Sequence, residues 1–466
     1  VVFRESHGLE ETETPFDPGQ DPADLVVLSF SDSDLGAFTA GYERMRKVGD
    51  ITHPTLRLAN IVALKHPVSV DTYVEKTLFA AKAILVRLIG GEAYWLYGLA
   101  TLQDLARRQG IALAVLPADG RPDPRLDELS TLPVSTLRRL QALCDEGGAV
   151  AAHAALAQLA LAAGIYVAPV IGDKTVPQMG FYDPDRGVIP APQARHPLPT
   201  EGEGPHQVIH GFTHPTPQNH PDAAPNASLP PTSERAVEGG QPASAIAPTA
   251  SHHAPDLSTT STRSKTPEPK GPVLVTFYRS YLTSGDTAPV DALIHALRAA
   301  GFAAYGAFAP SLKAPGVADW LSPHLTANPP VAVINATAFS AKSDTGQTPF
   351  DAALCPVFQV ALSTARRRDW AASDRGLSPA DLAMHVVLPE VDGRLFAGLI
   401  SHKSPGKRHP DLQFSRFAHR ADATRIQAVV DRITHWHHLA ATPAQDRQLA
   451  IILSTYPGRA HQMAHA

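Results

Sequence analysis

The sequence predicts an α/β protein of several domains, built from mostly parallel sheets flanked by helices, with a disordered insert rich in proline and histidine. Short apolar runs alternate with helix-like segments from about residue 22, which is the order that parallel sheets require. Bulky apolar residues nearly vanish between 194 and 271, so this stretch cannot bury enough surface to offset its ordering entropy. The predicted parts are a tail (1–22), a first α/β domain (23–193), the insert or linker (194–271) and a second α/β domain (272–466), truncated at its C-terminal end.

The first ordered region begins with the apolar run 23–30, which predicts a strand. Ser31 and the three residues after it then offer side-chain oxygens that can cap a helix. Further buried strands are expected at 82–90 and 111–119, and further helices at 92–109 and, as a pair, at 133–164. Gly110 follows the first of these helices, at the position where a left-handed glycine commonly ends a helix.

The second ordered region repeats the alternation. Strands are expected at 272–278, 302–309, 330–339 and within 352–362, and helices at 288–300, 378–388 and 419–441. The run 449–456 predicts one more buried strand, and 457–466 a turn that enters a helix. A parallel strand without its return helix is an unfinished unit, so we expect an N-terminal fragment of a longer protein.

Composition excludes several classes of function. The formal net charge is −5, so there is no basic excess for nucleic acid or an anionic membrane. Cys144 and Cys355 are far apart, which excludes a disulfide framework and favours a cytoplasmic setting. No apolar run reaches about 18 residues, so no transmembrane helix is expected. The sequence has no GxxxxGK[ST] motif, and any ATP used is therefore expected on a partner subunit.

A first candidate site follows the strand at 272–278, where open parallel sheets bind ligands. Arg279 and Tyr281 could meet propionate or amide groups at the edge of a ring. Asp286 could bind the same ligand, but Asp286 or Thr287 could equally cap the helix at 288–300.

A second candidate site lies within 388–404. Glu390, Asp392 and His402 combine two carboxylates and an imidazole, which suit divalent metals and the removal of protons from pyrrole nitrogens. The Glu-Val-Asp-Gly element is also an ordinary acidic turn, and that alternative stays open.

Long motifs resemble the large subunits of the cobaltochelatase and magnesium chelatase family. They occupy residues 23–35, 54–77, 88–102, 114–133, 277–301, 373–394 and 454–466. The form LRLANIVALKHP favours the cobalt branch. In related magnesium chelatases the acidic residue of the Pro-Glu-hydrophobic-Asp-Gly element is associated with the tetrapyrrole site, which implies that role for Glu390 here. Asp183 departs from the family, which commonly has histidine at that position, and the insert at 194–271 departs from it too.

The resemblance implies that the chain holds a corrin, hydrogenobyrinic acid a,c-diamide, while Co²⁺ enters it as a substrate during cobalamin synthesis. ATP and Mg²⁺ would bind a partner AAA+ subunit, aided by a subunit with an integrin-type metal domain. One alternative is insertion of Mg²⁺ into protoporphyrin IX. Another is a non-catalytic tetrapyrrole scaffold or metallochaperone. Glu390 is the expected proton acceptor, and Glu390, Asp392 and His402 are the expected metal ligands.

Overall fold

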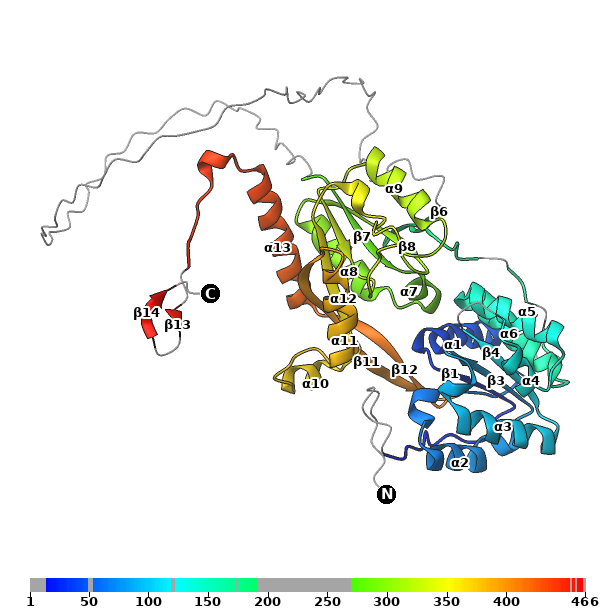
Figure 1. Ribbon diagram of the computed structural model, residues 1–466. Coiled ribbons are helices and arrows are strands. Elements are labelled where there is room, and N and C mark those ends of the chain that lie inside the picture. The colour runs from blue at the N-terminus through cyan, green and yellow to red at the C-terminus, as the bar shows by residue number, and fades with distance from the viewer. Residues whose placement is uncertain are drawn as a thin grey trace, which may run out of the picture. The chain divides into compact units, whose positions relative to one another are not determined.

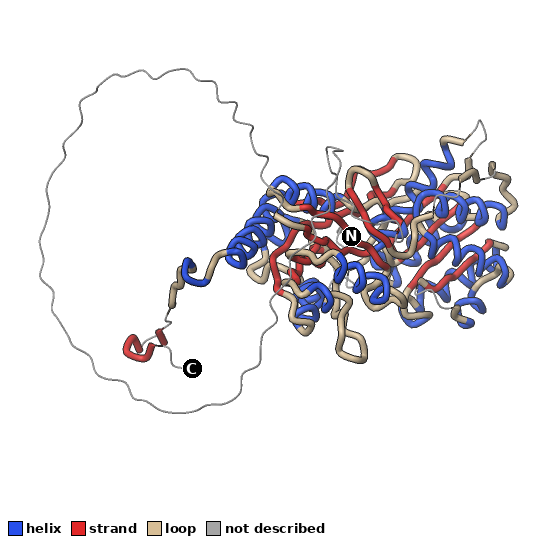
Figure 2. Tube along the Cα trace, turned by 90° about the horizontal axis from the view of Figure 1, so that it is seen from above, coloured by secondary structure: helices blue, strands red, loops and turns tan. Residues whose placement is uncertain are grey.

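The computed structural model describes residues 14–48, 53–118, 122–168, 170–172, 175–190, 270–452, 455–456 and 459–463. These residues form parallel-rich sheets flanked by helices, which confirms the predicted α/β class (Figures 1 and 2). The predicted insert, 194–271, lies outside the described residues apart from Lys270 and Gly271.

The first sheet is parallel throughout and has the strand order β2-β1-β3-β4. Its strands are β1 (Leu25–Ser29), β2 (Leu56–Asn60), β3 (Ala83–Leu88) and β4 (Ala112–Pro117). Its helices are α1 (Asp32–Arg46), α2 (Pro67–Lys76), α3 (Leu96–Gln109), α4 (Pro124–Leu129), α5 (Val134–Glu146) and α6 (Gly148–Ala162). The strand residues are buried on both faces, so alternate side chains enter two cores.

Local sequence signals determine the ends of these elements. The Ser31 hydroxyl accepts a hydrogen bond from the Asp34 backbone N–H, so it caps α1 as expected. Gly110 ends α3 at φ 72°, in the left-handed region where a β-carbon would be strained. The helix pair expected at 133–164 is present as α5 and α6.

The second sheet has the order β12-β11-β10-β9-β7-β8-β5-β6, with parallel pairing from β11 to β8. Its strands are β5 (Gly180–Asp183), β6 (Gly187–Pro190), β7 (Pro272–Tyr278), β8 (Ala303–Ala309), β9 (Ala332–Asn335), β10 (Val357–Ser363), β11 (Leu395–His409) and β12 (Phe414–Ala421). Its helices are α7 (Arg279–Ser284), α8 (Ala288–Ala299), α9 (Val317–Ala327), α10 (Arg367–Ala372), α11 (Pro379–Leu382), a π-helical turn (Ala383–Val387), α12 (Leu388–Glu390) and α13 (Ala423–Ala441). Short 3₁₀ turns occupy Ile61–Leu64, Leu78–Ala80, Glu92–Tyr94, Asp351–Ala353 and Ala444–Asp446.

Helices cover both faces of the second sheet. Buried side chains of α8 and α13 pack on one face, and those of α9 pack on the other. The strand β5 pairs with β8, and β6 pairs with β5, although the sequence places residues 180–190 in the first domain. Such pairing depends on partners more than 100 residues away, which local patterns do not reveal.

The prediction for the C-terminal end is wrong. Leu449, Ile451 and Ile452 are 86–93% exposed and form no strand. The end of the predicted strand is present as β13 (Thr455–Tyr456), which pairs in a local hairpin with β14 (Arg459–Met463), where a helix was expected. An apolar run becomes a buried strand only where a sheet edge pairs with it, and none pairs with 449–452 among the described residues.

Across the described ranges, no helix is both long enough and apolar enough to cross a membrane.

Candidate functional site

The segment that carries Glu390 connects the carboxyl end of β10 to the amino end of β11 (Figure 1). The fully buried Asp381, in α11, holds this segment against the sheet. That carboxylate accepts hydrogen bonds from the Ser363 hydroxyl (3.0 Å) and the Thr364 backbone N–H (2.9 Å), both at the end of β10. Because these contacts turn Asp381 towards the sheet, they determine which face of the segment is buried.

This crossover segment buries Asp381, His385 and Pro389, which are four residues apart. The next residue, Glu390, therefore lies on the outer side and is exposed. Its side chain makes no hydrogen bond or ion pair with any described residue, while its backbone carbonyl accepts from the Gly393 N–H (2.9 Å). The carboxylate is thus free to act on an external group. A π-helical turn precedes it, and such turns recur at functional sites.

Asp392 has a structural role. It is almost fully buried and pairs with Arg394 (Oδ2 to Nη2, 2.6 Å). The same carboxylate accepts from the Ser340 hydroxyl (2.5 Å) and the Ala341 N–H (2.6 Å). Its lone pairs therefore tie the loop after β9 to the start of β11, and they are not directed at a metal.

His402 is far from both carboxylates. It lies in β11, where the extended chain carries it roughly 20 Å beyond Leu395, at about 3.3 Å per residue. It is 2% exposed and packs against Trp370, with ring centroids 5.1 Å apart. Both ring nitrogens lack a hydrogen-bond partner among the described residues, and Asp422 lies 3.8 Å from Nε2.

The metal-binding set predicted from the sequence, Glu390, Asp392 and His402, is therefore not assembled. Among the described residues, no group of three or more histidine, cysteine, aspartate or glutamate side chains is arranged to hold a metal ion. The three residues are close in sequence but not in space. The extended strand β11 separates His402 from Glu390 and Asp392, whereas a turn or a helix would have kept them together.

Arg279 is also engaged by the protein itself. It is 7% exposed, and its guanidinium donates to the main-chain carbonyls of Pro177 (2.9 Å), Val176 (2.7 Å) and Asp145 (3.2 Å). It lines a cavity between the carboxyl ends of β1, β3 and β7, together with Arg87. Arg279 thus anchors loops around this cavity, and its donors are not presented to a ring edge.

Tyr281 and Asp286 lie against His419 of β12. The Tyr281 and His419 rings make an edge contact at 5.8 Å between centroids. The Asp286 carboxylate accepts from the His419 backbone N–H (2.9 and 3.2 Å), so it does not cap α8. Thr287 occupies the N-cap position, but its hydroxyl donates to Asp291 (2.7 Å). The predicted side-chain cap is therefore wrong at both residues.

Among the described residues, no hydrogen bond or ion pair joins Glu390 to Arg279, Tyr281 or Asp286, which contact other groups. The Glu390 turn leads into the amino end of β11, beside Phe358 near the start of β10. Arg279 and Tyr281 follow the carboxyl end of β7. The loop after β9 contacts both sets: the Tyr278 hydroxyl at the end of β7 donates to the Ala338 carbonyl (3.0 Å), and Arg394 donates to the Phe339 carbonyl (3.4 Å).

Burial perturbs the ionisation of the cluster around Asp286. Desolvation raises the pKa of Asp286 to about 6, against the opposing effects of the His419 N–H and the charges of Arg416 and Lys403. Desolvation lowers the pKa of His419 to about 3, and the neighbouring Lys403, His385 and His402 lower it further. His385 lies on the π-helical turn and His419 on β12, so no local sequence pattern marked their proximity.

The pKa shifts of Asp286 and His419 have opposite effects on how the stability of the protein depends on pH. A carboxyl with a raised pKa contributes stability that is present below its ordinary 3.8 and is lost as the pH rises through about 6. A histidine with a lowered pKa contributes stability that is present above 6.5 and is lost as the pH falls towards about 3.

Asp286→Asn should therefore lose stability more steeply than the wild type as the pH falls from about 6 to about 4, since only the histidine trend remains. Asparagine keeps an acceptor for the His419 N–H. Urea denaturation at fixed ionic strength measures the slope, and equal slopes would show that Asp286 titrates normally.

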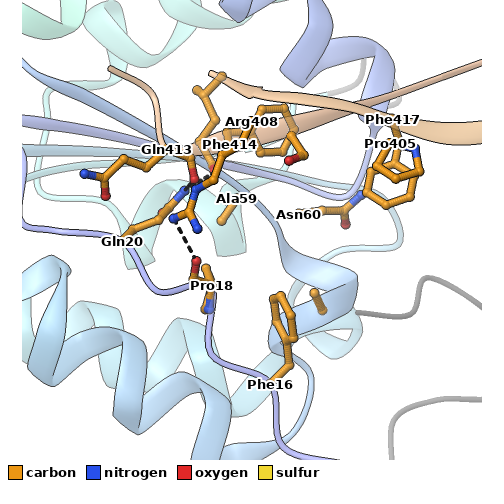
Figure 3. Close-up of a pocket in the computed structure, with 13 residues that line it drawn as sticks. Phe16, Pro18, Gln20, Ala59, Asn60, Pro405, Arg408, Gln413, Phe414 and Phe417 are labelled. Atoms are coloured by element: carbon orange, nitrogen blue, oxygen red, sulfur yellow. Dashed lines mark hydrogen bonds between the residues drawn. The ribbon is translucent and has the colours of Figure 1, made fainter. Parts of the chain in front are cut away.

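An apolar pocket lies between the N-terminal segment, the end of β2 and the β11–β12 hairpin (Figure 3). Its polar side chains are used within the protein: Arg408 donates to the carbonyls of Pro18 (3.2 Å) and Gly19 (2.6 Å), and Gln20 donates to that of Leu58 (2.9 Å). None of the predicted site residues lines it.

The fold and the site define an α/β protein with an exposed carboxylate on a crossover, unpaired within the described residues, and with no phosphate-loop motif in its sequence. Residues 174–466 match the family model described as CobN/Magnesium Chelatase. The match covers more than half of the chain, and the chain belongs to this family.

Named relatives include the aerobic cobaltochelatase subunit CobN of a Sinorhizobium species, which is 30% identical over 95% of this chain and 30% of the relative. The CobN protein of Pseudomonas aeruginosa is 28% identical over 94% of this chain and 30% of the relative. A magnesium-chelatase subunit from Rhodobacter capsulatus is 28% identical over 42% of this chain and 18% of the relative. The chain spans about three tenths of the length of the cobaltochelatase relatives.

The catalytic subunit of cobaltochelatase from Mycobacterium tuberculosis has a similar structure. The TM-score is 0.50 at 19% sequence identity, over 93% of this chain and 29% of the other. At this identity the likeness shows the shared fold.

Proposed function

We propose that this chain belongs to a cobaltochelatase subunit and helps to hold hydrogenobyrinic acid a,c-diamide while Co²⁺ is inserted. The observation that carries the proposal is the extent of the similarity: it covers 95% of the chain for a cobaltochelatase subunit and 42% for a magnesium chelatase subunit. Magnesium insertion into protoporphyrin IX is therefore the second candidate.

The chemistry requires a proton acceptor. When Co²⁺ enters a free-base ring, bonds form between the metal and the ring nitrogens, and the N–H protons leave. Glu390 supports this role because its carboxylate is exposed and unpaired within the described residues. A carboxylate positioned in this way accepts a proton and passes it to water. Asp392 is paired with Arg394 and His402 is buried against Trp370, so neither is assigned to this step.

ATP hydrolysis is assigned to partner subunits, an AAA+ motor and an integrin-type metal-domain subunit, because the 466 residues contain no phosphate-loop motif. Hydrolysis there would drive closure of the tetrapyrrole site here. The purified chain should accordingly show no ATP binding in the micromolar range by equilibrium dialysis with Mg²⁺ present. Micromolar affinity would contradict this division of labour.

The proposed substrate is tested by titrating the chain with each free-base ring. Binding of the corrin diamide in preference to protoporphyrin IX, followed by absorbance and calorimetry, supports cobalt insertion. The reverse preference would favour magnesium chelation, and binding of neither ring would remove a tetrapyrrole role from this chain.

A further inference from the structure

A basic surface surrounds α10, the short helix that follows β10. This helix buries none of its residues and lies beside β11 on the outside of the protein (Figure 1). The whole chain has a formal charge of −5, yet six arginines gather here from the α10 region, the end of β12 and the first turn of α13. Five of them are exposed and the first is half-buried: Arg366, Arg367, Arg368, Arg375, Arg420 and Arg425. These six residues and Trp370 are called the arginine surface below.

Trp370 lies at the centre of the arginine surface. One side of its ring packs against the buried His402, with the ring centroids 5.1 Å apart. The Arg425 guanidinium lies over the same ring, 4.5 Å from its centroid. A β-carbon on Gly376 would lie 3.6 Å from the indole Nε1, so the chain at Arg375 and Gly376 passes beside Trp370. The indole therefore holds arginines from two separate segments around one point.

Two further arginines adjoin this centre. Arg420 lies opposite His402 in the β11–β12 ladder, and residues directly opposite each other share one face of a sheet. The Arg367 Nε donates to Asp422 (3.1 Å), whose side chain caps α13. Burial lowers the pKa of His402, and the charges of Arg367 and Arg425 lower it further against the opposing charge of Asp422. The guanidinium groups thus act on the same small region of the protein.

The charge pattern of the arginine surface indicates a protein partner. Asp369, Asp374 and Asp422 lie among the six guanidinium groups, so the region has a formal charge of +3. A nucleic acid backbone presents only negative charge, and these carboxylates would repel it. A protein surface that is mostly acidic, with a few basic side chains, pairs with both signs. Arginine and tryptophan are also the residues most enriched at the energetic centres of protein interfaces.

We infer that the arginine surface docks an acidic surface of the ATP-hydrolysing partner assembly. The inference rests on the proposed function and adds to it the side of this chain on which the partner binds. Exposed charges act over a distance that salt screens to about 8 Å at physiological ionic strength. They therefore steer the encounter of the two proteins and affect the association rate more than the dissociation rate.

The test measures the association rate constant between the purified chain and the assembled partner subunits by biolayer interferometry at several salt concentrations. Arg368→Glu/Arg375→Glu should lower this constant by about tenfold at low salt, and the difference should shrink as salt is added. Arg368→Gln/Arg375→Gln should lower it less, because it removes charge without reversing it. Both arginines are exposed, and Arg368 pairs with its exposed neighbour Asp369, so the fold should survive either change.

The matched control is Arg107→Glu/Arg108→Glu. These two arginines are exposed in the last turn of α3, and Arg108 pairs with the exposed Asp104 of the same helix. The control changes the net charge of the chain by the same amount as the α10 variant. It should leave the association rate close to that of the wild type.

Slower, salt-dependent association in the α10 variants alone supports the arginine surface. Equal rates in the wild type and the glutamate variant overturn it and leave the proposed function standing. An equal loss in the α3 control reduces the effect to net charge and also overturns it. Tighter binding of a single-stranded oligonucleotide than of the partner subunits would make the surface a nucleic-acid site, contrary to the inference. If the wild-type chain binds the corrin diamide but no partner subunit, the docking surface fails alone, and if it binds neither, the proposed function fails as well.

Discussion

Glu390→Gln should lower the rate of cobalt insertion by roughly 10²–10⁴-fold, the usual effect of losing a positioned proton acceptor. Glutamine preserves the shape of the side chain and removes its basicity. The structure predicts that the fold survives, because Glu390 is exposed and its side chain makes no hydrogen bond or ion pair with the described residues. The rate is measured in the complete complex with its partner subunits, Co²⁺ and ATP.

Ring binding separates catalysis from affinity in this experiment. The variant should bind the corrin diamide within a few-fold of the wild type, since the loss concerns proton transfer. Glu75→Gln is the matched control, because Glu75 is an exposed helical glutamate in α2. Wild-type cobalt insertion by Glu390→Gln would remove Glu390 from the mechanism, and an equal loss in Glu75→Gln would indicate a general effect of charge.

The elements of the fold were predictable where local chemistry decides them. The Ser31 cap and the Gly110 terminus depend on residues within one turn, and both are present as expected. The pairing of β5 with β8 and the exposure of 449–452 were not predictable. Both depend on whether a distant sheet edge is available, which a single sequence does not show.

The candidate site was less predictable than the fold, because the roles of its residues depend on long-range partners. Arg279 was expected to bind a ligand, but carbonyl groups more than 100 residues away in sequence accept its hydrogen bonds. Asp392 looked like a metal ligand, but Arg394 and Ser340 saturate its carboxylate. Glu390 stays a candidate because the fold turns Asp381 and Pro389 inward and leaves it outside.

Asp392→Asn should lower the free energy of unfolding by roughly 3–5 kcal/mol, the usual cost of breaking a buried ion pair by removing one partner. Arg394 and Asp392 have side chains only 2% and 1% exposed, so the variant leaves a buried guanidinium without its counter-charge. The loop after β9 also loses an anionic acceptor at Ser340 and Ala341. Denaturant titration at neutral pH measures the change.

The matched control is Asp369→Asn, which breaks the exposed ion pair with Arg368 (57% and 74% exposed) and should change stability by at most about 1 kcal/mol. This comparison decides between the two roles of Asp392. A metal ligand outside the folding core would lose Co²⁺ affinity at unchanged stability. If Asp392 is a structural anchor, its loss lowers stability, because the loop after β9 is no longer tied to the start of β11. Unchanged stability in Asp392→Asn would therefore return Asp392 to the set of candidate metal ligands.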